Sequence, residues 1–278
     1  MNDHALPPED YAEPRCLLCD EPYGTAPEVR SVPQRRIADK LDEYMSRRDY
    51  PGAERHLLYW LEEARLGHDL RGELFLCNEL IGHYRKAADR DKALPHIERA
   101  LALLDELDYG GTVSAGTTLV NAATACNAFG EDERALSLFE RARAAYESAP
   151  DVRPELLGGL YNNMAVVCQS LGRFSEAFAL YDRAMETMAR VPGGALEQAV
   201  TCLNRADAIA AAEGLEAGEA RINELLERAY ALLCDADAPR NGYYAFVCEK
   251  CAPGFAYYGW FAAAAELKET AEEIYERA

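Results

Sequence analysis

The sequence feature that most constrains the fold of this chain is a position inside predicted helices that is usually alanine. It recurs at steps of about 42 residues. Its occurrences are 40, 42, 42, 45 and 42 residues apart, at Ala53, Ala93, Ala135, Ala177, Ile222 and Ala264. A small residue is needed where two helices cross closely, and larger apolar residues fill the space beside the crossing. A pair of short helices cannot bury its apolar face alone, so the recurrence predicts a stack of similar helical hairpins.

The pattern is clearest in residues 158–188, GGLYNNMAVVCQSLGRFSEAFALYDRAMETM. They predict one helix through Ser170 and a second from about Ser175, with a break at Leu171-Gly172-Arg173. The large and small residues at fixed steps are Tyr161, Met164, Ala165, Cys168, Ala177, Tyr181 and Ala184. The arrangement resembles a tetratricopeptide repeat (TPR). The Tyr-Asn-Asn run and the long spacing are most similar to the kinesin light chain-like long-repeat subgroup of bacterial type.

We therefore expect an all-α fold, a right-handed superhelical solenoid of about six TPR-like hairpins. Residues 1–33 carry six of the thirteen prolines and no helical period, and we expect them to form a flexible arm. Pro253-Gly254 is expected to kink or split the helix around it. The solenoid is expected over residues 34–278, with repeats at about 34–73, 74–115, 116–157, 158–199, 200–244 and 245–278.

Composition narrows the class of function. The net charge of −19 argues against a surface that follows nucleic-acid phosphates, because such a surface needs clustered Lys and Arg. No window approaches the roughly 20 apolar residues of a membrane span. The cysteine usage favours a reducing, cytoplasmic location. The sequence contains no GxxxxGK[ST], HExxH or GxSxG motif, and the five histidines have no metal-ligand spacing, so we expect no catalysis.

Amides recur on the helices expected to line the concave groove. The position two residues after the large opening residue of the first helix holds Asn121, Asn163, Arg205 and Lys250 in repeats three to six. One position earlier, asparagine recurs at Asn78, Asn162 and Asn204. An amide offers a donor and an acceptor, which suits an extended peptide backbone. The alternative is that these amides bridge neighbouring helices and hold their register.

The resemblance adds a role for these residues. In some tetratricopeptide clamps, asparagine together with Arg or Lys grips peptide carboxylates. The lysines that complete such clamps have no counterpart here, since Thr117, Gly159 and Thr201 stand at the expected places. The match to a carboxylate clamp is therefore partial.

Two Cys-x-x-Cys pairs, Cys16/Cys19 and Cys248/Cys251, together make a ligand set for tetrahedral zinc. Their separation is far outside the usual spacing of a zinc knuckle, so the two ends of the chain, or two chains of a homodimer, would have to meet. Cys248 and Cys251 also occupy helix positions where other repeats carry core residues. We therefore favour buried thiols and no cofactor, with zinc as the alternative.

These features predict a non-catalytic scaffold that binds a protein or peptide in the concave groove, with no nucleic-acid or membrane partner. The alternative is a peptide-responsive regulator, which resembles bacterial quorum-sensing tetratricopeptide regulators but lacks their N-terminal helix-turn-helix DNA-binding module. A scaffold should be indifferent to small peptides, whereas a regulator should change its compactness on binding one.

Overall fold

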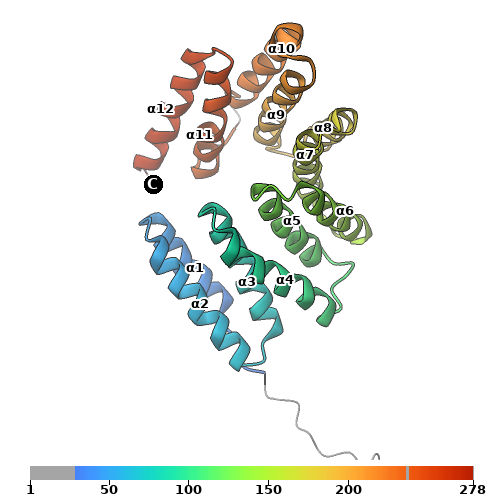
Figure 1. Ribbon diagram of the computed structural model, residues 1–278. Coiled ribbons are helices and arrows are strands. Elements are labelled where there is room, and N and C mark those ends of the chain that lie inside the picture. Colours follow the sequence, from blue (N-terminus) through green and yellow to red (C-terminus); the bar gives the residue numbers. More distant parts are fainter. Residues whose placement is uncertain (1–28, 236–237, 278) are drawn as a thin grey trace, which may run out of the picture. The chain divides into compact units, whose positions relative to one another are not determined.

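The computed structural model describes residues 29–235 and 238–277 (Figure 1). These residues form α-helices and no strand, as the expected all-α fold requires. The helices are α1 Gln34–Ser46, α2 Tyr50–Leu66, α3 Leu70–Lys86, α4 Arg90–Glu106, α5 Val113–Ala128, α6 Asp132–Ser148, α7 Pro154–Ser170, α8 Phe174–Met188, α9 Ala195–Glu213, α10 Leu215–Leu233, α11 Gly242–Tyr257 and α12 Phe261–Arg277. Most of the expected arm, including Cys16 and Cys19, lies outside the described residues.

The chain divides into two compact units, residues 1–76 and 77–278. In the first unit, α1 packs against α2, and Ile37 of α1 is buried, as are Leu57 and Leu61 of α2. The buried carboxylate of Asp69 precedes α3 and accepts hydrogen bonds from the backbone N–H groups of Gly72 and Val32, each at 2.9 Å. Asp69 therefore caps α3 and ties the segment before α1 to it.

The second unit is a stack of helical hairpins. The helices α5, α7, α9 and α11 each pack along the second helix of their own hairpin, and these four first helices also contact one another in succession. Figure 1 shows these first helices along one side of the stack and the second helices α6, α8, α10 and α12 along the other. This is the architecture of a helical-repeat solenoid, in which each hairpin buries its apolar face against its neighbours.

Each second helix places a small, buried residue at its fourth position. The backbone N–H of that residue bonds to the carbonyl of the residue just before the helix in all six hairpins. The residues in this position are Ala53, Ala93, Ala135, Ala177, Gly218 and Ala264. The expectation of Ile222 in the fifth repeat was wrong by four residues. A Cβ on Gly218 would come within 2.6 Å of Ile209 Cγ2, so the crossing of α9 and α10 is too close even for alanine.

Two further expectations need correction. The first helices of repeats two to six begin three to five residues before the expected repeat boundaries, since each starts with about one further helical turn before the residues of the repeat pattern. The helix containing Pro253-Gly254 is not split, because α11 continues to Tyr257, and the kink stays a prediction. Pro253 is exposed, and Gly254 leaves room for the side chain of Leu203, which lies 3.6 Å from where its Cβ would be.

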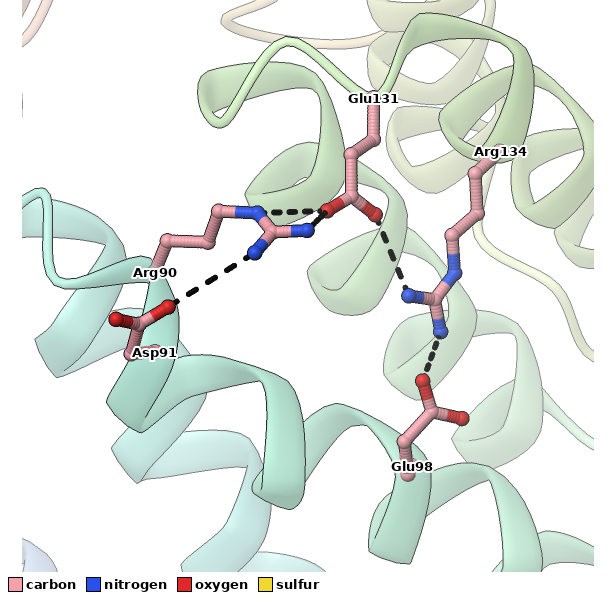
Figure 2. Close-up of polar contacts among 5 residues, drawn as sticks. All are labelled: Arg90, Asp91, Glu98, Glu131 and Arg134. Atoms are coloured by element: carbon pink, nitrogen blue, oxygen red, sulfur yellow. Dashed lines mark hydrogen bonds and ion pairs between the residues drawn. The ribbon is translucent and has the colours of Figure 1, made fainter.

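Ion pairs join α4 to α6 on the outside of the second unit (Figure 2). Glu131, just before α6, accepts hydrogen bonds from Arg90 Nη2 at 2.6 Å and from Arg134 Nη1 at 3.3 Å. Arg134 also bonds to Glu98 at 2.5 Å. Glu131 therefore bridges two cations that belong to successive second helices.

No helix in the described ranges combines the length and apolar character needed to cross a membrane.

Candidate binding face

The structure places the predicted binding residues on first helices of the second unit. Asn78 lies on α3, Asn121 on α5, Asn162 and Asn163 on α7, Asn204 and Arg205 on α9, and Lys250 on α11. All are half-buried except Lys250, which is exposed. We call the solvent-facing side of α5, α7, α9 and α11 the first-helix face.

Four of the asparagines link the first helices of successive hairpins. The Nδ2 group of Asn121 donates to Oδ1 of Asn78 at 3.2 Å, and Nδ2 of Asn78 donates to the buried hydroxyl of Thr118 at 3.0 Å. In the same way, Nδ2 of Asn204 donates to Oδ1 of Asn162 at 3.0 Å. These are the contacts expected if amides hold the register of neighbouring helices. Whether the same amides also bind a peptide stays a prediction.

The other three candidates are not brought together. The Arg205 guanidinium turns to α8 and pairs with Asp182 at 2.5 Å. A carboxylate on a ligand would therefore have to share or displace Asp182. Asn163 follows Asn162 in α7 and is half-buried. Lys250 is exposed on α11. The structure thus separates the four bridging amides from Arg205, Asn163 and Lys250, which are not part of the two amide bridges.

Two carboxylates of α9, which the sequence did not single out, are held by tyrosines of the last hairpin. The Tyr243 hydroxyl donates to Glu197, and the Tyr258 hydroxyl donates to Asp207 at 2.7 Å. Burial raises the pKa of Glu197, and the nearby charge of Lys250 only partly opposes that rise. Burial likewise raises the pKa of Asp207 against the hydrogen bond from Tyr258. The sequence signal was a dense aromatic cluster after Asn241, which consists of Tyr243, Tyr244, Phe246, Phe255, Tyr257, Tyr258, Trp260 and Phe261. The α9 partners of Tyr243 and Tyr258 lie about 50 residues earlier in the chain.

Of the candidate zinc ligands, only Cys248 and Cys251 fall within the described residues. Both thiols are buried in α11. Burial raises the pKa of Cys248 to about 11 and that of Cys251 to about 12, so both thiols stay protonated at neutral pH. In this setting they act as small apolar core residues.

Comparison with known proteins agrees with this architecture. Residues 75–148 match the family model described as tetratricopeptide repeat. An 82-residue segment is 33% identical to response regulator aspartate phosphatase H of Bacillus subtilis (strain 168). That match covers 29% of this chain and 21% of the relative, so it spans about a fifth of the relative's length.

Two solved structures share the fold over most of their length. One is a protein of Podosopora anserina assigned as a kinesin light chain with nearly identical TPR-like repeats (TM-score 0.51, 20% identity, 73% of this chain and 94% of that chain). The other is BtubC (BKLC) from P. vanneervenii (TM-score 0.50, 17% identity, 88% of this chain and 91% of that chain). The chain thus has the fold of a tetratricopeptide-repeat solenoid, and residues 75–148 match the model of that family. It shares this fold with the two kinesin light chain-like structures.

Proposed function

We propose that this chain is a non-catalytic scaffold that binds a protein or peptide on its first-helix face. The observation that carries the proposal is a stripe of exposed aromatic residues along α11. Tyr243, Phe246 and Tyr257 are 49%, 52% and 67% exposed. Together with Lys250 they recur at helical spacing, so they share one side of the helix. Large aromatic groups are enriched at protein interfaces relative to the rest of the surface.

A charge reversal within the stripe tests this proposal. We expect Lys250→Glu to weaken binding of the partner about tenfold, because a side chain at the interface would repel the group it formerly attracted. The matched control is Lys268→Glu, the same charge change at an exposed position of α12. The measurement is quantitative recovery of partners from an extract of the source cell by wild type and both variants, followed by titration of the recovered partner. Equal binding by Lys250→Glu and wild type would contradict the proposal.

The second candidate is a peptide-responsive regulator. It is supported by the similarity of an 82-residue segment to a protein named as a phosphatase of response regulators, response regulator aspartate phosphatase H. A regulator needs two arrangements of its hairpins with different affinities for the peptide. Small-angle scattering with and without candidate signalling peptides distinguishes the two. A peptide-dependent change in radius of gyration favours the regulator, and an unchanged radius with retained protein binding favours the scaffold.

A further inference from the structure

A pocket of about 430 Å³ lies in the second unit between the start of α10 and the end of α11. Its volume is at the lower end of the range for small-molecule sites, which is enough for one long side chain. The lining comprises two carboxylates, two aliphatic side chains and two tyrosines: Glu216, Glu219, Leu215, Ile222, Tyr257 and Tyr258. Leu215 is 51% exposed and forms an apolar rim together with the exposed Tyr257.

The walls of the pocket are fixed by contacts within the fold. Gly214 has a φ of +88°, which lets the chain reverse between α9 and α10 without further residues. Tyr258 is held by its hydrogen bond to Asp207, and the ring of Tyr257 packs edge-on against it at 5.0 Å. Asn223, which also lines the pocket, accepts a hydrogen bond from the indole N–H of Trp260 at 3.4 Å. A ligand would therefore meet a pocket that is already formed.

The charge of the pocket has one sign. Glu216 and Glu219 are three residues apart on α10, so their carboxylates share one side of the helix. The lining contains no lysine or arginine, and the neighbouring Arg221 pairs with Glu213 at 2.9 Å instead. Within the described part of the chain, neither glutamate of the pocket forms an ion pair. The complementary ligand is a cation with an apolar stem.

We infer that this pocket binds the side chain of an arginine in an exposed segment of a partner protein. The aliphatic stem of an arginine would pack on Leu215 and Ile222. Its guanidinium would bond to Glu216 and Glu219 and lie against the ring of Tyr257. A planar guanidinium suits a pair of carboxylates beside an aromatic face better than the compact ammonium of lysine does. The inference rests on the proposed protein-binding function, for which it names one feature of the partner.

The chain supplies its own reporter for a test. It contains two tryptophans, Trp60 and Trp260, so Trp60→Phe leaves Trp260 beside the pocket as the sole source of indole fluorescence. The probes are three blocked peptides, acetyl-Leu-Gly-Xaa-Gly-Leu-amide, in which the central residue is arginine, lysine or citrulline. Citrulline has nearly the shape of arginine without its charge. We expect the arginine peptide to shift the Trp260 emission saturably, and to bind at least tenfold more tightly than the citrulline peptide.

Matched variants assign the binding to this pocket. Glu216→Gln with Glu219→Gln should weaken the arginine peptide at least tenfold. The control, Glu224→Gln with Glu227→Gln, makes the same charge change at exposed positions of α10 outside the pocket and should change affinity less than twofold. Equal losses in both double variants, no saturable binding, or tighter binding of lysine than of arginine would each overturn the inference. Loss of the inference would leave the scaffold proposal intact if Lys250→Glu still reduced recovery of the partner.

Discussion

Two junctions between neighbouring hairpins of the second unit are held together by different kinds of contact. Between the hairpins α3–α4 and α5–α6, the links are Asn78 to Asn121 on the first helices and Arg90 of α4 to Glu131, just before α6. Between the hairpins α9–α10 and α11–α12, the links include tyrosine hydroxyls on carboxylates, such as Tyr258 on Asp207, and an indole on Asn223. The earlier junction uses residues at nearly equivalent repeat positions. The later one depends on aromatic residues, most of them in the last hairpin and one, Tyr230, on α10.

The comparison has a consequence for where the chain presents binding groups. At the earlier junction, paired amides and ion pairs satisfy one another across the hairpins, which favours a fixed register. At the later junction, part of the aromatic surface packs and part stays exposed, as Tyr244 is buried and its neighbour Tyr243 is half-exposed. Both the exposed stripe of α11 and the pocket beside α10 lie at this junction. We therefore place the binding groups at the aromatic end of the second unit.

The largest expected effect concerns helix crossings in the two regions. Gly218→Ala in α10 should lower the free energy of unfolding by about 1–3 kcal/mol, because the new methyl group would press on the buried Ile209. Gly159→Ala in α7 should instead raise it by up to about 1 kcal/mol, because no neighbouring atom lies within 4 Å of its Cβ position and alanine favours the helix. Chemical denaturation of both variants measures the two changes. Two changes of the same sign would contradict the assignment of Gly218 to the closest crossing.

That pair of glycines shows how far the sequence could be interpreted. The all-α fold and the hairpin architecture followed from the recurring alanines, because helix crossings demand small residues at a fixed step. In the fifth hairpin the small position was predicted four residues too late, at Ile222, because the small residue is Gly218 and the repeat was recognised by its alanines. The short turn at Gly214 could not be deduced either, since it depends on one residue that adopts a positive φ.

The candidate site was predictable in part for a similar reason. Recurring asparagines marked the first helices, since polar amides inside helices at equal steps need partners. The sequence could not show that Asn78 pairs with Asn121, because their separation is one residue longer than the step between Asn162 and Asn204. The carboxylate partners of Tyr243 and Tyr258 lie on the preceding hairpin, and no spacing rule connects them to the aromatic cluster.

A smaller effect should distinguish the amides that bridge two helices from Asn163, which is not part of either amide bridge. Asn204→Ala should lower the free energy of unfolding by about 0.5–1.5 kcal/mol, because it removes the hydrogen bond to the half-buried Asn162. Asn163→Ala should have less effect on stability. A double-mutant cycle with Asn162→Ala and Asn204→Ala should show coupling, and the same cycle with Asn163→Ala in place of Asn162→Ala should show none. Equal coupling in both cycles would mean that the amide bridge contributes nothing specific.

The smallest expected effect concerns the pH dependence of stability, to which Glu131 and Glu197 should contribute with opposite signs. Burial tends to raise the pKa of Glu131, but hydrogen bonds from Arg90 and Arg134 lower it overall, below its ordinary value of 4.5. Burial of Glu197 raises the pKa of that carboxyl above 4.5, with the charge of Lys250 in partial opposition. Ionised Glu131 is thus favoured by the folded state, and ionised Glu197 is disfavoured by it.

The two carboxylates should therefore make opposite contributions to the pH dependence of stability. The stability that Glu131 contributes is present above pH 4.5 and is lost as the pH falls through its lowered pKa. Glu197 has the reverse effect, since stability falls as the pH rises from about 4.5 through its raised pKa. We expect changes of about 0.2–1 kcal/mol, the range for partly exposed pairs. Denaturation curves between pH 3 and pH 7 should show that Glu131→Gln removes a loss on acidification, whereas Glu197→Gln removes a loss on alkalinisation. A change of the pH dependence of stability in the same direction in both variants would contradict the proposed contrast between the junction with ion pairs at Glu131 and the junction with a tyrosine hydrogen bond at Glu197.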